Sequence, residues 1–375
     1  MHPQQLGIDF VGFPRGKLGV GEMVRSLMRV ALHKGYQINA IDCIHQDDLI
    51  LNDHDEFDPY ISNEFKYNLR IYSLTQNHIA ALLYRFGTAF FDNKMNIFHL
   101  AWEFDTRPKE LDSVLQFCDE IWAISEFTAK AFENNFNIPV YTMHCPVDSP
   151  SFLKRDRSFF KLPSDLFLYC FSFDMNSFLT RKNPLACINA FKLAYEKNKK
   201  IGLVIKVSNA DAKSTDWQNL LNLISNNVNI FIINEIFDKK TVYSLFDCCD
   251  AYISLHRSEG FGIGMAENML LEKPIICTGY SGNMDFCTSE NSFLVDYSLT
   301  DVKKDQYISA EGFHWAEPSI LSAVHCMEQV YDKRTLSNTR ALLGQSDIEA
   351  HFSVAGLSDK FDNFVKRFIA RSLSK

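Results

Sequence analysis

The chain has 375 residues, of which 46% are hydrophobic, and its formal net charge is −8. This length favours two domains of ordinary size, and the apolar content is sufficient for two hydrophobic cores. The negative charge lies in residues 1–150, which hold 12 basic and 20 acidic residues, whereas the remainder holds 26 of each. A nucleic-acid-binding protein should carry a basic face, and neither half of the chain favours that class of partner.

Targeting signals and cysteine usage indicate a cytoplasmic protein. The sequence has no run of eighteen apolar residues, so no membrane span is predicted. The first ten residues, MHPQQLGIDF, lack the basic region and apolar core of a secretory signal. The ten cysteines are scattered, mostly in apolar runs, without a C-x-x-C pair or zinc-ligand spacing. We therefore expect buried thiols in a reducing compartment.

Strands and helices alternate along the first 149 residues, which is typical of a parallel α/β domain. The acidic stretch at residues 45–64 is predicted to be a loop. Helices are expected after the first strand, where Gly35 ends the pattern, and near residues 79–86 and 126 onward. The expected strands are residues 7–13, 36–44, 69–74, 95–102, 119–125 and 139–145.

Two places in this half carry candidate functional residues. Gly19 and Gly21 lie between the first strand and its helix, where a glycine-rich turn can cradle phosphate or can simply turn the chain. The strand at 95–102 carries His99 and ends at Trp102, followed by further charged residues. That edge is a candidate catalytic edge, and the alternative is a core tryptophan with solvated charges.

A proline-bracketed connector at residues 146–150 marks the predicted domain boundary. The second half continues the alternation of strands and helices, with strands at 167–173, 202–207 and 228–236 and helices near 184 and 238–248. We predict a domain at 1–149, a second domain at 150–345 and a terminal helical segment at 346–375.

Basic residues near two of these strand ends are candidate phosphate ligands. Arg181 and Lys182 lie in the loop 174–183, and cations at the mouth of a sheet can neutralise a leaving diphosphate. An Arg-Lys pair can equally be solvated surface. Lys206, near the end of the strand 202–207, is expected to face a cleft rather than the core.

The segment 251–296 carries the strongest pattern in the chain. It is predicted to form a strand at 252–255, a loop at 256–262, a helix to residue 271 and a strand at 274–278. Glu259 lies in the loop and Glu267 in the first turns of the helix, and three glycines separate them. Ligands of parallel sheets collect at such strand ends, where helix N-termini present free N–H groups. We expect a diphosphate on the backbone amides of Phe261, Gly262, Ile263 and Gly264, with Glu267 accepting hydrogen bonds from a ribose diol. Two carboxylates here could also be solvated or cap the helix.

The pattern E-G-F-G-x-x-x-x-E, followed by Lys273-Pro274 and the loop Ser281-Gly282-Asn283, resembles the signature of retaining glycosyltransferase family four, the glycosyl transferases group 1. Residues 102–108 resemble the W-E-x-D-x-x-P stretch of bacterial members. The resemblance implies the GT-B fold, in which two Rossmann-like doubly wound domains face a central cleft. It also implies a C-terminal helix that crosses back to the first domain.

The function implied by the resemblance is metal-independent, retaining transfer of a sugar from a UDP- or GDP-sugar to a glycan or lipid-linked glycan. Such enzymes commonly serve bacterial lipopolysaccharide, capsule or O-antigen synthesis. In the roles that the resemblance implies, Glu259 holds the donor sugar, Glu267 clamps the ribose, and Lys182, Arg181 and the loop amides meet the diphosphate. Lys206 is a further candidate for binding the nucleotide sugar. The loop of Gly19 and Gly21 would touch donor phosphate or acceptor. The acceptor side would comprise His99, Trp102, Glu103 and Asp105.

The chain departs from the family pattern at one position. The Arg that commonly follows the strand 167–173 falls near Ser172 to Asp174, which is not basic, and whether Arg181 replaces it stays open. Two alternatives remain: a sugar-nucleotide epimerase or hydrolase of the same fold, and a non-catalytic nucleotide-sugar-binding subunit, which only the missing Arg supports.

Two patterns near the C-terminus complete the predictions. Trp315-Ala316-Glu317-Pro318 is expected to start a helix that runs through Val330. The segment from Asp359 is amphipathic at helical spacing, and we expect its apolar face to pack on the first domain. Only weak, peripheral contact with the inner face of the cell membrane is then expected, because the first half is acidic.

Overall fold

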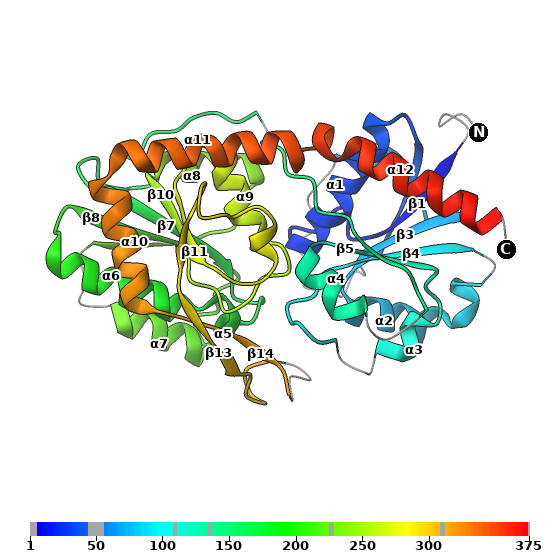
Figure 1. Cartoon of the computed structure of the whole chain (residues 1–375), viewed down its shortest axis with the longest axis horizontal. Helices are drawn as coiled ribbons and strands as arrows, with labels where there is room; N and C mark the ends of the chain where they lie inside the picture. The colour runs from blue at the N-terminus through cyan, green and yellow to red at the C-terminus, as the bar shows by residue number, and fades with distance from the viewer. Residues whose placement is uncertain are drawn as a thin grey trace. The chain divides into compact units, whose positions relative to one another are not determined.

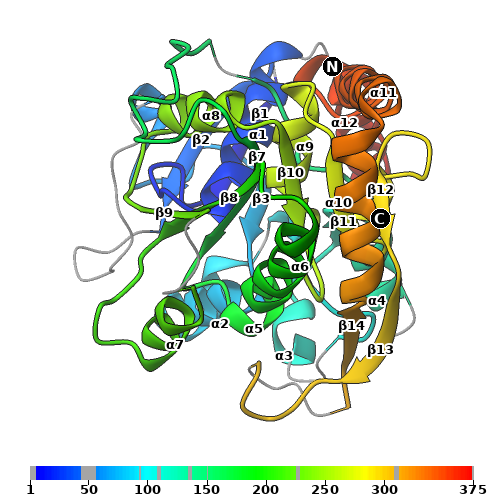
Figure 2. The same cartoon turned by 90° about the vertical axis from the view of Figure 1, so that its left-hand side faces the viewer.

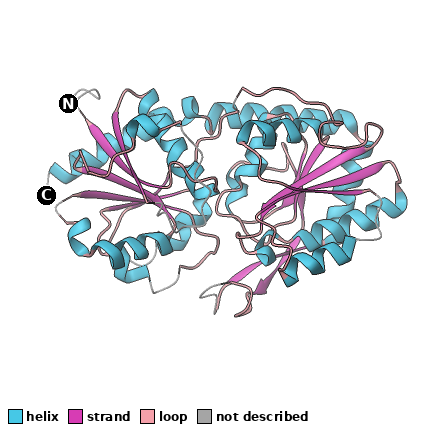
Figure 3. Ribbon diagram, turned by 180° about the vertical axis from the view of Figure 1, so that it is seen from behind, coloured by secondary structure: helices cyan, strands magenta, loops and turns pink. Residues whose placement is uncertain are grey.

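The computed structural model describes residues 6–43, 56–92, 94–107, 111–133, 137–149, 151–224, 229–307 and 312–373 (Figure 1). The chain divides into two compact units. Unit 1 comprises residues 1–147 with 349–375, and unit 2 comprises residues 148–348. Each unit has its own parallel six-stranded sheet with helices on both faces (Figure 3). The two Rossmann-like α/β units agree with the predicted fold class.

The strand order in the sheet of unit 1 is β2-β1-β3-β4-β5-β6. The topological switch point therefore lies between β1 and β3. All described pairings in this sheet are parallel. The strands are almost continuously buried because helices cover both faces of such a sheet. Its helices and strands are β1 (Gly7–Gly12), α1 (Gly19–His33), β2 (Gln37–Asp42), η2 (Asp58–Tyr60), β3 (Leu69–Leu74), α2 (Gln76–Phe86), η3 (Thr88–Phe90), β4 (Met95–Leu100), α3 (Asp112–Leu115), β5 (Glu120–Ala123), α4 (Glu126–Glu133), β6 (Val140–Thr142) and α12 (Val354–Leu373).

The C-terminal helix α12 packs on unit 1 beside α1 (Figure 1). Phe361, Val365 and Phe368 are fully buried in the same core as residues of α1 and the sheet. The Tyr36 hydroxyl donates a hydrogen bond of 2.6 Å to Asp362. The helix begins five residues earlier than the expected start at Asp359. Its apolar face is therefore part of the core of unit 1.

A buried carboxylate also holds α12 in place. Glu120 is fully buried at the start of β5, and both Arg367 and Arg371 reach it at 3.0 Å. The Trp122 indole N–H donates to the same carboxylate at 2.8 Å. A buried carboxylate is tolerated when it is paired and hydrogen-bonded in this way. Two of the basic residues of α12, Arg367 and Arg371, thus serve its docking on unit 1.

Unit 2 orders its strands β12-β11-β10-β7-β8-β9, and an antiparallel pair β13-β14 accompanies this sheet. Residues of α6, α7 and α10 share one hydrophobic core on one face of the sheet, and α6 and α10 lie side by side (Figure 2). The elements are β7 (Phe167–Asp174), α5 (Leu179–Lys182), α6 (Pro184–Lys197), β8 (Ile201–Ser208), α7 (Thr215–Ile224), β9 (Ile230–Asn234), α8 (Lys239–Cys248), β10 (Ala251–Ser254), α9 (Ile263–Leu270), β11 (Ile275–Thr278), η5 (Gly282–Asp285), β12 (Phe293–Val295), β13 (Tyr297–Asp301), β14 (His314–Pro318), α10 (Ile320–Asp332) and α11 (Arg334–His351).

One predicted element is wrong. Residues Trp315 to Pro318 do not start a helix but form β14, which pairs with β13 in antiparallel register. Pro318 disfavours helical backbone at the residue before it. The helix starts instead after Ser319, whose hydroxyl accepts from the Ser322 N–H at 3.3 Å as an N-cap.

Other expectations fall short or lie outside the described residues. The loop 174–183 contains one helical turn, α5, which was not predicted. Residues 45–55 of the acidic stretch are outside the described residues, and the stretch includes the short turn η2. All ten cysteines are free thiols, and eight of them are buried. Within the described ranges, no helix combines the length and apolarity needed to cross a membrane.

Candidate active site

The candidate site lies in unit 2 at the carboxyl ends of β7, β8, β10 and β11. The predicted segment folds nearly as expected, with β10 leading into the loop 255–262 and then into α9. Glu259 lies in this loop and is 8% exposed. Parallel sheets bring the carboxyl ends of all their strands to one edge. Loops far apart in the sequence therefore meet here.

The principal cluster joins Glu259 to the two cations of α5. Lys182 Nζ lies 2.6 Å from Oε1 of Glu259, and Arg181 Nη1 lies 3.1 Å from Oε2. Arg181 also donates to the Ser258 carbonyl at 2.9 Å. The side chain of Arg181 is only 6% exposed, whereas that of Lys182 is 20% exposed. Lys182 is thus the more accessible cation, and Arg181 is enclosed behind it.

Left-handed residues shape the turn that presents these cations. Phe178 has φ 56° and Asn183 has φ 53°, and they bracket the four residues of α5. Asn183 also caps α6, because its side chain accepts from the Ala186 N–H at 3.3 Å. Asparagine tolerates this conformation and is a preferred N-cap residue. The chain can therefore end one helical turn and start a helix at a single residue.

The cations keep Glu259 ionised despite its burial. Burial raises the pKa of this carboxyl group, but the charges of Lys182 and Arg181 outweigh it and lower the pKa to about 2. His256, in the same loop, is fully buried, and burial lowers its pKa. The net result is an enclosed carboxylate paired with one buried and one partly exposed cation.

A second loop, which follows β11, is hydrogen-bonded to the Glu259 loop. The Glu259 N–H donates to the Ser281 hydroxyl at 2.8 Å, and the Gly282 N–H donates to the Glu259 carbonyl at 2.9 Å. A Cβ on Gly282 would lie 2.0 Å from the Gly260 carbonyl oxygen. Asn283 adds its side-chain oxygen, which lies 3.0 Å from His256 Nε2. The Ser281-Gly282-Asn283 motif therefore supports the Glu259 loop through close backbone contact.

The first turn of α9 supplies the predicted amides. Gly262 is its N-cap with φ 97°, and a Cβ there would lie 2.4 Å from Met265. Phe261 is 2% exposed and packs on Phe286 with ring centroids 5.1 Å apart. A Cβ on Gly264 would lie 2.9 Å from the Tyr252 hydroxyl. The first N–H groups of a helix have no acceptor within the helix, so this turn is suited to an anion.

Two further predicted residues have partners that the sequence did not suggest. Glu267 has a 13% exposed side chain and lies 3.6 Å from Nζ of Lys239, the first residue of α8. Lys206 is only 4% exposed, so it does not stand open at the sheet edge as expected. Its ammonium donates to the Val207 carbonyl at 3.1 Å and the Ser208 hydroxyl at 2.8 Å. Burial lowers the pKa of Lys206 to about 8, although Asp174 opposes that shift.

Gly19 and Gly21 lie in the first turn of α1 in unit 1, and of the two only Gly21 has close contacts. A Cβ on Gly21 would lie 2.3 Å from the Gly16 carbonyl oxygen, whereas Gly19 has open space around it. Arg25 of α1 donates to the Gly16 carbonyl at 2.8 Å. Gly21 is therefore required for close approach of α1 to the preceding loop, and Gly19 is not.

The predicted role of His99 as a catalytic residue does not fit its surroundings. His99 is fully buried in β4, where Ser73 Oγ lies 2.9 Å from Nδ1 and the Met143 carbonyl lies 3.0 Å from Nε2. The carbonyl can only accept, so Nε2 carries the proton and Nδ1 accepts from the serine. Burial lowers the pKa of His99 to about 4. In this structure the neutral ring cross-links three segments of unit 1. Both of its nitrogens are already hydrogen-bonded, so neither is available to a substrate hydroxyl.

The remaining acceptor-side candidates differ in exposure. Trp102 is 1% exposed, and its indole donates to the Thr106 carbonyl at 2.9 Å, so it is a core residue. Glu103 is half-buried and Asp105 is exposed. Pro108, the end of the quoted stretch, lies outside the described residues.

Residues 164–304 match the model of the family described as Glycosyl transferases group 1. The matched segment contains α5 with Arg181 and Lys182, and it contains both Glu259 and Glu267. No curated protein matches the sequence. The family match therefore covers most of unit 2.

Solved structures extend the similarity of fold to nearly the whole chain. Sucrose-phosphate synthase of Thermosynechococcus elongatus has 11% identity and a TM-score of 0.70, covering 98% of this chain and 100% of that chain. HepE of Anabaena, solved with UDP and glucose, has 13% identity and a TM-score of 0.69, covering 97% and 100%. TarM of S. aureus, solved with UDP, has 13% identity and a TM-score of 0.58, covering 78% of this chain and 54% of TarM. This chain thus spans about half of TarM, and these neighbours support the GT-B fold.

Sequence reasoning missed Lys239, which accompanies Glu267. A signal existed, because Lys239 starts α8 soon after the carboxyl end of β9, where ligands of parallel sheets collect. Nothing in the spacing linked it to a carboxylate of α9. The described residues hold no group of three or more His, Cys, Asp or Glu side chains arranged for a metal ion.

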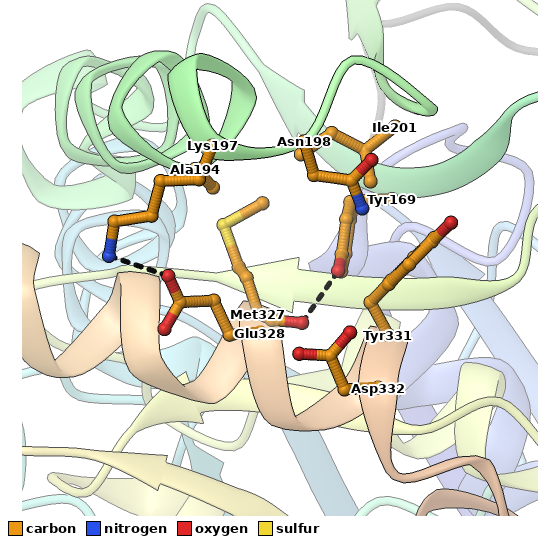
Figure 4. Close-up of a pocket in the computed structure, with 9 residues that line it drawn as sticks. All are labelled: Tyr169, Ala194, Lys197, Asn198, Ile201, Met327, Glu328, Tyr331 and Asp332. Carbon is orange, nitrogen blue, oxygen red and sulfur yellow. Dashed lines mark hydrogen bonds and ion pairs between the residues drawn. The ribbon is translucent and has the colours of Figure 1, made fainter.

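A cavity of about 310 Å³ lies elsewhere in unit 2, between α6 and α10 at the amino ends of β7 and β8 (Figure 4). Tyr169 and Met327 close its floor through a hydrogen bond of 2.7 Å, and Lys197 pairs with Glu328 at its rim. It contains none of the predicted site residues, and it lies at the opposite edge of the sheet from Glu259.

Proposed function

We propose that this chain is a retaining glycosyltransferase that moves a sugar from a nucleoside-diphosphate sugar to a glycan acceptor. The observation that carries the proposal is the contact of Glu259 with Lys182 and Arg181, beside the N-terminus of α9. The family match over residues 164–304 supports it, because the cluster lies inside the matched segment.

The chemistry requires the bond between the anomeric carbon and the diphosphate oxygen to break. Positive charge develops on the sugar ring while negative charge gathers on the leaving diphosphate. Lys182 and the first N–H groups of α9 are suited to the diphosphate, because preorganised donors stabilise charge where it develops. A bond to the acceptor oxygen forms on the same face of the sugar, and the acceptor proton passes to the departing diphosphate. Glu259 would hold donor-sugar hydroxyls near the cationic ring.

Arg181 serves this site differently from a direct phosphate ligand. Its guanidinium bonds to Glu259 and to the Ser258 carbonyl, and its side chain is almost fully enclosed. We propose that Arg181 supplies the charge that the family obtains from an Arg directly after the strand. It would do so mainly by setting the position and ionisation of Glu259, while Lys182 meets the diphosphate.

The nucleotide is proposed to be UDP. HepE and TarM, whose folds resemble this one, were solved with UDP, and HepE was also solved with glucose. Glu267 would accept from the ribose diol, and Lys206 would lie behind the diphosphate. A negatively charged ligand should favour the protonated form of Lys206, whose pKa of about 8 lies close to neutrality.

The acceptor is proposed to be a glycan or lipid-linked glycan of bacterial surface polysaccharide. Glu103 and Asp105 are the acceptor-side candidates that keep exposed surface. Work at the inner face of the membrane would need only weak, peripheral contact. The burial of the apolar face of α12 supports that expectation, because this face is not available as an interfacial anchor.

The proposal predicts turnover of a nucleotide sugar without added metal. A panel of UDP-, GDP- and ADP-sugars should show slow donor hydrolysis with a UDP-sugar, measured as nucleotide release. The rate should persist in EDTA because Lys182 and the α9 amides can take the diphosphate charge. Loss of turnover in EDTA and its return with Mn²⁺ or Mg²⁺ would contradict the metal-independent reading. A protein that neither binds nor hydrolyses any member of the panel would contradict the proposed function.

Replacing Glu267 by alanine should weaken UDP binding by roughly 1–3 kcal/mol, the cost of losing a charged hydrogen-bond partner. Calorimetric titration of UDP measures this directly. Glu290→Ala, which removes an exposed carboxylate elsewhere in unit 2, is the control and should leave the affinity unchanged. Equal UDP affinity in Glu267→Ala and the wild type would remove Glu267 from the ribose site.

A further inference from the structure

Arg257, two residues before Glu259, ties the Glu259 loop to α5. Its backbone N–H donates to the Arg181 carbonyl at 2.8 Å. Its Nη1 donates to the Thr180 carbonyl at 2.7 Å. Two consecutive carbonyls of the short helical turn are thus held by a single residue. This turn is the one that presents Lys182 to Glu259.

The same arginine is fixed from its other side by β14. Nε of Arg257 lies 2.7 Å from Oε2 of Glu317, and the guanidinium carbon lies 5.4 Å from the centre of the Trp315 ring. The Arg257 carbonyl accepts from the Ala316 N–H at 2.9 Å. Because Trp315 is 1% exposed, this support is itself anchored in the core of unit 2.

A second contact joins the hairpin region to the start of α5. The ring of Tyr307, in the segment after β13, lies 4.2 Å from the ring of Phe178, centroid to centroid. Phe178 is the left-handed residue at the N-cap of α5. A single helical turn has little stability of its own, because nucleation fixes several residues for one hydrogen bond. The placement of α5 must therefore come from such tertiary contacts.

We infer that Arg257 is a positioning residue, braced by the hairpin β13–β14, that holds Lys182 and Arg181 in contact with Glu259. This inference rests on the proposed function, since the cluster is the proposed donor site. It assigns a purpose to the W-A-E-P strand, whose Glu317 orients the guanidinium and whose backbone pairs with the Glu259 loop. Arg257 acts on the chemistry through α5.

The chain offers a closely matched control in Arg157. Its side chain is 20% exposed, compared with 18% for Arg257, and it also bonds one carboxylate, Asp250, at 2.7 Å. It donates to the Leu166 carbonyl at 2.7 Å and the Cys248 carbonyl at 2.9 Å. These contacts lie in unit 2 at the amino ends of β7 and β10, away from the candidate site. Arg157→Ala therefore removes a similar set of bonds without touching α5.

Thermal unfolding, UDP affinity and donor hydrolysis are measured for the wild type, Arg257→Ala, Arg257→Lys, Glu317→Gln and Arg157→Ala. We expect the two alanine variants to lose similar stability. Of these two variants, only Arg257→Ala should lower kcat. The expected loss is roughly 10- to 100-fold, because small misplacement of reacting groups has effects of that size. Arg257→Lys should recover part of the rate. Glu317→Gln is a milder change and should also lower kcat. It provides the test if Arg257→Ala does not fold.

The pH profile separates positioning from general destabilisation. The cations Lys182 and Arg181 of α5, with a smaller effect from the titratable His256 of its own loop, hold the pKa of Glu259 at about 2. If α5 moves away, burial raises that pKa, and the ionised fraction of Glu259 falls as the pH drops. Arg257→Ala should then show an acid limb in kcat at a higher pH than the wild type. Arg157→Ala should keep the wild-type profile.

The outcomes separate the inference from the proposed function. An active wild type, with Arg257→Ala equal to Arg157→Ala in kcat and in its pH profile, overturns the inference alone. A wild type that neither binds UDP nor hydrolyses any donor overturns the proposed function and this inference with it.

Discussion

Glu259→Gln is expected to lower kcat for donor hydrolysis and transfer by about 10²–10³-fold, the scale seen when one preorganised electrostatic group is removed. The substitution keeps the size of the side chain but removes the charge that faces Lys182 and Arg181. In the proposed mechanism, the developing positive charge on the sugar ring then loses the carboxylate that faces it. Initial rates at saturating donor measure the effect.

The same variant separates catalysis from nucleotide binding. Without the Glu259 charge, Lys182 and Arg181 present more positive charge to a diphosphate, so UDP should bind as tightly as before or more tightly. Glu290→Gln, at an exposed position of the same unit, should leave both quantities unchanged. A folded Glu259→Gln protein with the wild-type kcat would exclude Glu259 from the reaction. A large loss of UDP affinity would instead place this carboxylate in the nucleotide site.

Phe361→Ala is expected to reduce the free energy of unfolding of unit 1 by about 3–5 kcal/mol, the range for truncating a buried phenylalanine. Phe361 is fully buried, and its ring lies 5.9 Å from Tyr36 and 5.6 Å from Trp122, centroid to centroid. The cavity would open between α12 and the sheet. Urea denaturation followed by fluorescence or circular dichroism measures the change.

The control for this prediction is Tyr84→Ala in the same unit. Tyr84 is 95% exposed, so its truncation should change stability by less than about 0.5 kcal/mol. Equal stabilities for Phe361→Ala and Tyr84→Ala would show that α12 contributes little to unit 1 in solution. The apolar face of the tail would then become available for other contacts, including a membrane surface.

The Glu259 segment was predictable from the sequence because its signals are local. Glycines at 260, 262 and 264 allow a tight turn between an apolar strand and an apolar helix. The observed α9 and β11 begin within one or two residues of the predicted positions. The amphipathic tail was predictable for the same reason, since helical spacing places Phe361, Val365 and Phe368 on one face. Periodicity and turn chemistry act over a few residues, so one sequence is enough to read them.

The charge pairing inside the site was decided by the tertiary structure. Lys182 and Glu259 are 77 residues apart, and they meet because β7 and β10 are neighbours in a parallel sheet. Lys239 at the start of α8 likewise meets Glu267 of α9, although β9 and β10, the strands before these helices, are separated in the sheet by β7 and β8. Spacing along the chain holds no information on which strand ends are adjacent.

The sequence alone determined the two α/β domains, the strand-loop-helix that carries Glu259 and Glu267, and the amphipathic tail. The tertiary structure decided that residues 314–318 are a strand, because their extended backbone depends on pairing with β13. It also decided that His99 is a buried cross-link, because Ser73 and Met143 occupy both ring nitrogens. In both cases the hydrogen-bonding partners, β13 for residues 314–318 and Ser73 and Met143 for His99, lie outside the local sequence. Only folding brings them within hydrogen-bonding distance.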